Sequence, residues 1–297
     1  MRRWWTALAV GSAAALVLAG CGTPTGVDGD LTDEWPTLPV PRVFVPTEGA
    51  CHAGVQDVGY LSGWNPVDCA GTHHTETMHV GTLTGASGRS AAPPAAGSPA
   101  VRAARTECDR EVRREIGADW RAGRLGLTVV FPSPPGWTGG ARWFRCELGE
   151  IKGIDEPGIR PRTGSLRGAL TGDSALRLGC FDPKVSRDDV RAMSPVPCTA
   201  RHHAEFVGVW QAPDVSYAEF QRSGDRIHRG CLDLIARHTG VPNDGDLKFR
   251  AGSIYYGPAE RDWRNGNHTV QCFLWLTDRT LTRSLRNTGP RSLPLRK

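Results

Sequence analysis

The chain has 297 residues, of which 23% are charged, and a formal net charge of +5, which fits a folded protein and gives no argument for nucleic-acid binding. The composition excludes a polytopic membrane protein, a coiled coil and a collagen-like chain. Arg2 and Arg3 open the sequence, and an apolar stretch follows from Trp4 to Leu18. This stretch is too short to span a bilayer as a helix, but it suits the apolar region of a signal peptide.

The signal region ends in Leu18-Ala19-Gly20-Cys21, which resembles a bacterial lipobox. The Cys21 thiol would take a diacylglyceryl group, joined by an amide-linked acyl chain such as palmitate, and two chains make membrane attachment stable. We therefore predict a signal peptide over 1–20 and a lipoprotein on the extracytoplasmic face of the bacterial cell membrane. The alternative is an ordinary cleaved signal with a chance cysteine. Residues 21–49, rich in Pro, Gly, Thr and Asp, are predicted to form a flexible tether.

The remaining eight cysteines form two sets with similar spacing. They are Cys51, Cys69, Cys108 and Cys146, then Cys180, Cys198, Cys231 and Cys272. An even number per half, outside the cytoplasm, predicts disulfides, although four cysteines allow three pairings. In each half a predicted helix cysteine faces the sheet, where the cysteine of the last strand is its expected partner. We therefore favour pairing the first cysteine with the second, and the third with the fourth, in each set.

Other features repeat in step with the cysteines. Cys69, His73 and Glu76 match Cys198, His202 and Glu205, and Trp137 and Trp263 each lie nine residues before the last cysteine of their set. Ser165-Leu166-Arg167 matches Ser284-Leu285-Arg286. Four coincident features in one order predict two homologous domains. The predicted boundaries are 50–155 for the first copy, 156–175 for a linker, 176–280 for the second copy and 281–297 for a basic tail.

The second copy shows the predicted elements best. Ser216-Tyr-Ala-Glu219 is a capping box that opens a helix, whose apolar face includes Ile227, Cys231 and Ile235. Strands are predicted over 175–181, 204–210, 247–256 and 269–276, with a turn at 258–266.

The first copy follows the same order. Its helix face includes Ala104, Cys108 and Val112, and strands are predicted over 125–131 and 142–148. The low-complexity insert at 85–99 is interpreted as a flexible loop. The fold class is therefore α+β: two disulfide-stapled domains, each a small antiparallel sheet with one packed helix, in the order ββαββ.

The combined pattern resembles the septum formation domain of actinobacterial envelope proteins. The resemblance rests on the Cys-x3-His-x2-Glu element in both halves, a helix cysteine, a Trp before the last cysteine, and the trailing Ser-Leu-Arg. It covers both copies and implies an extracytoplasmic role near cell division or wall growth, with no settled biochemical activity. The family's usual proline before the histidine is replaced by Thr72 and Arg201.

His73, Glu76, His202 and Glu205 carry the main chemical hypotheses. His and carboxylate ligands suit zinc, but one extended strand supplies at most two ligands to one site, and no HExxH spacing occurs. A structural role, in which the histidine caps a turn and the glutamate pairs with an arginine or a backbone donor, is favoured over partner binding and over metal. Trp137 and Trp263, placed in turns, are the surface candidates for binding a partner.

Two function classes follow. We favour a non-catalytic envelope lipoprotein without a cofactor, held to the membrane by its lipid, that binds a division or wall-synthesis protein or a cell-wall polymer. No serine-nucleophile motif or P-loop occurs, and the eight cysteines after Cys21 are all assigned to disulfides. The alternative is a metal-dependent envelope hydrolase that uses the His/Glu clusters. The basic tail is interpreted as solvated.

Overall fold

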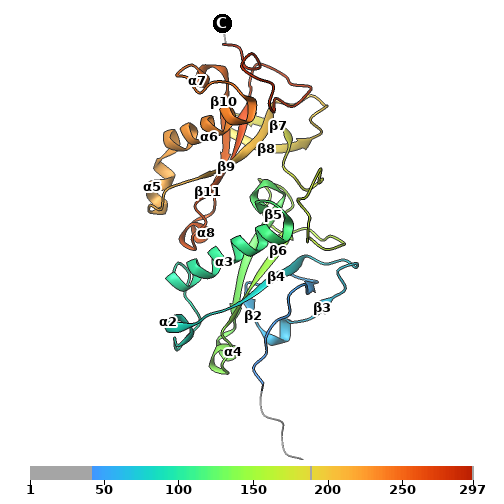
Figure 1. The fold of residues 1–297 in the computed structure, drawn as a ribbon, viewed down its shortest axis with the longest axis vertical. Coiled ribbons are helices and arrows are strands. Elements are labelled where there is room, and N and C mark those ends of the chain that lie inside the picture. The colour runs from blue at the N-terminus through green and yellow to red at the C-terminus, as the bar shows by residue number, and fades with distance from the viewer. Residues whose placement is uncertain (1–41, 188, 296–297) are drawn as a thin grey trace, which may run out of the picture. The chain divides into compact units, whose positions relative to one another are not determined.

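The computed structural model describes residues 42–187 and 189–295. The predicted signal peptide, Cys21 and most of the tether therefore lie outside the described residues. Two β-sheets, each with one long helix against it, account for most of the described chain, so the fold class is α+β (Figure 1). Both sheets belong to one unit that begins at Val43.

The first sheet has six strands in the order β2-β5-β6-β4-β1-β3. These strands are β1 (Cys51–His52), β2 (Val58–Gly59), β3 (Pro66–Val67), β4 (Thr75–Thr82), β5 (Leu125–Pro132) and β6 (Trp143–Glu150). All neighbours are antiparallel except β2, which runs parallel to β5. The helical segments of this half are η1 (Leu61–Gly63), α2 (Gly85–Gly88), α3 (Pro99–Ile116), η2 (Trp120–Ala122) and α4 (Pro134–Thr138).

Local signals explain where α3 begins and ends. The Ser98 side chain accepts a hydrogen bond from the Val101 N–H, and Pro99 stands at the first helical position. Gly117 ends the helix at φ 85°, a left-handed conformation that favours glycine. One face of α3 buries Ala104, Cys108, Val112 and Ile116, whose four-residue spacing places them in one row against the sheet.

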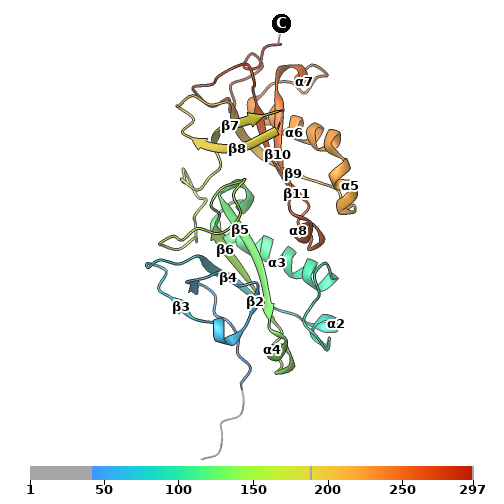
Figure 2. The same cartoon turned by 180° about the vertical axis from the view of Figure 1, so that it is seen from behind.

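The second sheet has five strands in the order β10-β11-β9-β7-β8. They are β7 (Cys180–Ser186), β8 (Asp189–Val196), β9 (Ala204–Gln211), β10 (Gly252–Tyr256) and β11 (Thr269–Trp275), and all pairs are antiparallel. The helices are α5 (Tyr217–Arg222), α6 (Gly224–Thr239), α7 (Leu247–Arg250) and α8 (Glu260–Arg264). Seen from behind, the hairpin of β7 and β8 stands at the edge of this sheet (Figure 2).

The two sheets have the same strand order once β2 is set aside. The series β5-β6-β4-β1-β3 corresponds, position by position, to β10-β11-β9-β7-β8. The predicted ββαββ order is incomplete. In each half one more strand, β3 or β8, lies in the sequence between the two strands that were predicted to precede the helix. Neither strand has a clear signal in the sequence. β3 is two residues long and begins with Pro66, while β8 contains Pro195 and lacks regular alternation of polar and apolar residues.

Several predicted elements differ in detail from the observed ones. The helix expected from Ser216 is interrupted at Ser223, which separates α5 from α6. The strand expected over 247–256 begins instead with α7, and the turn expected at 258–266 contains α8. The insert at 85–99 contains α2, and the Ser90 carbonyl accepts a hydrogen bond from Trp137 Nε1 at 2.8 Å. Composition alone could not show that other elements hold this insert.

Four disulfides join the cysteines in the predicted pairs: Cys51–Cys69, Cys108–Cys146, Cys180–Cys198 and Cys231–Cys272. The second and fourth join the long helix of each half to its last strand, and all four of their cysteines are fully buried. The first and third join β1 or β7 to the turn that precedes β4 or β9. Each half is therefore stapled both through its core and at its edge.

The predicted linker and tail both contribute to the cores. Leu166 and Leu170 lie in the core beneath α3, and Leu281, Leu285 and Leu293 lie in the core beneath α6. The interpretation of the tail as solvated is therefore wrong for its described part. Its three leucines are buried in the core, although the arginines between them made the segment look polar in the sequence. Among the described residues, no helix is long and apolar enough to cross a membrane.

Candidate functional site

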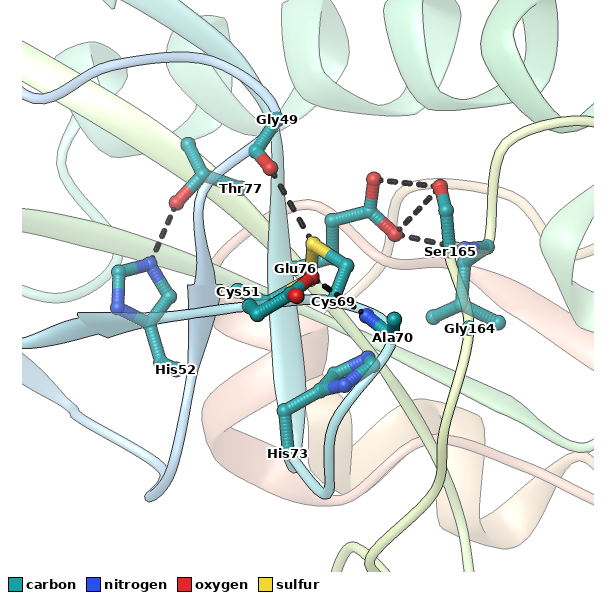
Figure 3. Close-up of a disulfide and its surroundings, with 12 residues drawn as sticks. Gly49, Cys51, His52, Cys69, Ala70, His73, Glu76, Thr77, Gly164 and Ser165 are labelled. Atoms are coloured by element: carbon teal, nitrogen blue, oxygen red, sulfur yellow. Dashed lines mark hydrogen bonds between the residues drawn. A yellow bond between two sulfur atoms is a disulfide. The ribbon is translucent and has the colours of Figure 1, made fainter.

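The predicted His/Glu residues occupy equivalent places in the two halves. His73 and Glu76 lie just before and within β4, and His202 and Glu205 lie just before and within β9. All four are at most 1% exposed. Figure 3 shows the first of these sites, where the Glu76 side chain points toward Ser165 beside the Cys51–Cys69 disulfide.

Each glutamate holds the Ser-Leu-Arg segment that follows its domain. Glu76 accepts hydrogen bonds from the Ser165 hydroxyl at 2.8 Å and from the Leu166 N–H at 2.6 Å (Figure 3). Glu205 accepts the same two bonds from Ser284 and Leu285, both at 2.9 Å. The two sequence motifs are therefore the two sides of one contact. A charged acceptor makes such hydrogen bonds stronger than neutral ones.

Each histidine is tied to the same trailing segment through its backbone. His73 pairs with Arg162, and His202 pairs with Leu281, by two backbone hydrogen bonds in each case. Both rings direct Nδ1 at a backbone carbonyl, that of Gly71 at 3.0 Å in the first half and that of Ala200 at 2.8 Å in the second. The carbonyl only accepts, so Nδ1 is a donor in both contacts. The predicted role of this histidine in a turn after the disulfide agrees with these contacts.

The two sites differ at the second ring nitrogen. His73 Nε2 is buried and has no hydrogen-bond partner among the described residues. His202 Nε2 lies 3.2 Å from Glu205 Oε1, and His238 Nε2 from α6 lies 3.2 Å from Glu205 Oε2. The second site is therefore a buried cluster of one carboxylate and two imidazoles, whereas the first has a single unpartnered imidazole nitrogen.

The pKa of Glu205 reflects two opposing influences. Burial alone would raise it, but hydrogen bonds from His238, His202, the Leu285 N–H and Ser284 together outweigh burial and hold the pKa below its ordinary value. The carboxylate is therefore ionised at neutral pH.

Metal-ligating side chains come close together at both sites. One group within the described residues is Cys51, Cys69 and Glu76, and another is Cys180, His202 and Glu205. The cysteines are disulfide-bonded and provide no thiolate. Only His202 and Glu205 then remain as ligands in the second group, and they are already bonded to each other and to neighbouring donors. The His238 imidazole also contacts Glu205, but both Glu205 oxygens already accept hydrogen bonds from Ser284 or the Leu285 N–H, so this carboxylate is committed to the trailing segment.

The prediction that Trp137 and Trp263 lie at the surface is wrong. Trp137 is in α4 and 1% exposed, and Trp263 is in α8 and 2% exposed. Trp137 Nε1 donates to the Ser90 carbonyl, and Trp263 Nε1 donates to the Val215 carbonyl, both at 2.8 Å. Residues in turns were expected to be exposed to solvent. Here the indole of each short helix points into the protein and donates a hydrogen bond to a loop that is distant in the sequence. These residues provide no exposed face for a partner.

We expect Trp263→Phe to lower the free energy of unfolding by about 2 kcal/mol, because the half-buried Val215 carbonyl loses its donor and a smaller ring leaves space beside Phe220. Urea denaturation of the disulfide-intact protein measures the change. Phe249→Ala, at a half-exposed ring on α7, is the control and should change stability by less than about 0.5 kcal/mol. An equal effect of the two substitutions would contradict the anchoring role of the indole.

Sequence reasoning missed a buried polar network on the face of the first sheet opposite α3. Arg145 Nε lies 3.0 Å from Glu147 Oε1, and that oxygen accepts a hydrogen bond from Thr77 at 2.7 Å. His52 Nε2 lies 2.9 Å from the Thr77 hydroxyl, and burial lowers the pKa of His52, against an opposing effect of Glu147. Arg145 and Glu147 alternate with apolar residues in β6, a pattern typical of a solvated face.

The N-terminal segment covers this network. The Arg145 guanidinium lies 5.0 Å from the Trp64 ring centre, and Trp143 Nε1 donates to the Phe44 carbonyl at 3.0 Å. The end of the predicted tether therefore packs on the sheet from residue 44. The aromatic residues of this segment were the only sequence signal that could have indicated the cover.

Comparison with known proteins identifies the family. The family model described as septum formation matches residues 48–272, a stretch that includes the first sheet and all of the second except the last three residues of β11. The chain therefore belongs to the septum formation family. No curated protein and no solved structure gives a significant match.

Proposed function

We propose that the chain is a non-catalytic binding module of the cell envelope, anchored at Cys21 to the extracytoplasmic face of the membrane and acting in septum formation. The family supports the role in septum formation. The main support for a non-catalytic module is the use of both His/Glu pairs as internal acceptors and donors. Because these groups hold the trailing segments, they are not available to bind a substrate.

We also propose that the two halves are homologous copies, with the domain limits given above extended to include the trailing segments. The support is the shared strand order, the paired disulfides and the repeated contacts of His73 and His202. Even the strand register agrees, since Glu76 stands opposite Leu148 and Glu205 opposite Leu274. Duplication of a stapled module adds binding surface without adding chemistry.

The partner is proposed to be a division or wall-synthesis protein, or the cell-wall polymer itself. The metal-dependent hydrolase considered from sequence receives no support from the two carboxylates, because Glu76 and Glu205 are both committed to the trailing segments. A binding module needs an exposed face, and in this chain such a face must lie away from the buried His, Glu and Trp residues.

Changing the lipidated cysteine tests the anchoring. We expect wild-type protein to enter the detergent phase in a membrane-partition assay and to concentrate at division sites by fluorescence microscopy. Cys21→Ala should enter the aqueous phase and lose that concentration, because stable attachment needs the acyl chains. Gly22→Ala keeps the cysteine and is the matched control.

Two results would contradict separate parts of the proposal. If Cys21→Ala stays in the detergent phase, the lipid anchor is wrong. If wild-type protein is spread evenly over the membrane of dividing cells, the septal role is wrong even when anchoring holds.

A further inference from the structure

A cleft of about 490 Å³ lies between the first half and α8 of the second. Its apolar lining includes Val58, Pro93, Pro94, Val101, Val129 and Phe131. The Gly97 N–H donates to Asn265 Oδ1 at 2.8 Å, and Arg102 pairs with Asp214 at 3.1 Å, so polar contacts between the halves hold the walls. The insert and α8, which sequence reasoning interpreted as a loop and a turn, are two of those walls.

One side of the cleft is the edge of β5, which has no neighbouring strand over most of its length among the described residues. β2 pairs with β5 only at Phe131 and Pro132, and no other described strand pairs with that edge of β5. The Leu127 carbonyl accepts a hydrogen bond from Arg105 Nη1 at 3.2 Å, so the backbone of Leu127 points away from β6. Alternation gives Val129 the same direction. Leu127 and Val129 both line the cleft, so an extended backbone could pair with β5 there, in line with β2.

Arg105 places a buried cation beside this edge. Its side chain is only 7% exposed, it lines the cleft, and its Nε has no hydrogen-bond partner among the described residues. The nearest acidic group, Asp262 Oδ1, is 3.9 Å from Nη1, beyond hydrogen-bond length. Burial lowers the pKa of Arg105 to about 10, since the cation has lost water without gaining a close counter-ion. A carboxylate in the cleft would supply that counter-ion.

The remaining charges stand at the rim. Asp262 is half-exposed and competes for Arg105, while Arg261 and Asp57 are exposed and lie 4.0 Å apart. The rim therefore carries one more negative charge than positive, and Arg105 is the deep charge that balances it. An apolar wall, an open strand edge and one deep guanidinium together select an extended, mostly apolar peptide with one acidic group.

We propose that the cleft binds an extended peptide strand of a partner protein, which pairs with the edge of β5 and presents a carboxylate to Arg105. The proposal deepens the binding function proposed above and rests on it, because it gives the module a site and the partner a chemistry. Leu127 and Val129 provide the backbone groups, Val129 and Phe131 provide apolar contact, and Arg105 provides specificity for the carboxylate.

A peptide library tests the proposal on the full chain purified in detergent. Beads that carry random hexapeptides are selected against wild-type protein, and affinities of the enriched peptides are measured by fluorescence polarisation. We expect enriched sequences to be β-branched or aromatic with one carboxylate. Replacing that carboxylate by its amide should weaken binding about tenfold or more, and N-methylation of alternate backbone amides should abolish it. Both changes are made in the peptide, so they leave the fold of the protein intact.

Protein variants then assign the carboxylate to Arg105. With Arg105→Gln, acid and amide peptides should bind equally weakly, whereas Arg110→Gln, at an exposed position of the same helix, should bind as wild type. Asp262→Asn removes the competing carboxylate and should tighten binding of the acid peptide. This gain cannot arise from a misfolded protein.

Three outcomes would overturn the site. The library could give no carboxylate-bearing peptide that binds wild type better than it binds Arg105→Gln. N-methylation of the peptide could leave its affinity unchanged, or Asp262→Asn could bind the acid peptide more weakly than wild type does. They differ from failure of the proposed function, which would appear as loss of anchoring or of septal location while peptide binding persists.

Discussion

Removing the Cys231–Cys272 disulfide by a double change to alanine should lower the free energy of unfolding by about 4 kcal/mol. The bond closes a loop with a sequence separation of 41, and loops of that length contribute about that much in the chain-entropy model. Both cysteines are fully buried between α6 and β11, so the loss of two sulfur atoms also leaves a small cavity. Against a total of about 5–15 kcal/mol for a folded protein, this is a large effect.

Urea denaturation of the double variant measures the loss, with Cys180→Ala/Cys198→Ala as the matched comparison. That bond has a sequence separation of 18 and a half-buried cysteine, so its removal should cost about 3 kcal/mol. If removing Cys231–Cys272 lowers the free energy of unfolding less than removing Cys180–Cys198 does, the packing of α6 on its sheet does not depend on the disulfide.

Glu205→Gln should cost about 3–5 kcal/mol at neutral pH, because a buried, hydrogen-bonded carboxylate loses its charge while His202 and His238 remain beside it. The cost should shrink in acid. The folded pKa of Glu205 is below the ordinary value of 4.5, so its contribution to stability is complete above pH 4.5 and is lost as the pH falls through the folded pKa.

Free energies of unfolding measured for wild type and variant at neutral pH and at steps below pH 4.5 give this difference directly. Other acidic groups with lowered pKa values, such as Asp109, are present in both proteins and cancel. Glu156→Gln, at an exposed position outside the helices and strands, is the control and should be nearly neutral. A difference between wild type and Glu205→Gln that grows as the pH falls would contradict the assignment of the shift to Glu205.

The sequence alone was enough to predict the repeated framework. Cysteine spacing predicted disulfides but left three pairings open in each half, and the expected contact between the helix cysteine and the last-strand cysteine favoured the pairs that the structure has. The Cys-x3-His-x2-Glu element and the trailing Ser-Leu-Arg were found as repeats, but their contact was not predicted. Nothing local in the sequence says that Glu76 meets Leu166, ninety positions away.

Packing over long distances accounts for the other differences. Trp137 and Trp263 looked exposed because they stand among turn residues, and only the loops they hold explain their burial. Arg145 and Glu147 alternate with apolar residues in β6, a pattern typical of an exposed face, and only the N-terminal cover explains their burial. The cleft was invisible for the same reason, since its walls come from an insert, a strand edge and a helix of the other half.

The trailing segments also determine where the chain can be cut. A first half ended at residue 155 would lose Ser165 and Leu166, leaving Glu76 as a buried carboxylate without donors and the core beneath α3 short of two leucines. A second half ended at residue 280 would lose Leu281, Leu285 and Leu293 in the same way. The export that we propose would deliver the chain from its N-terminus, so neither half would close before its last leucine had crossed. Residues 281–293 thus complete the core of the second half, and a protease that removed them would expose that core.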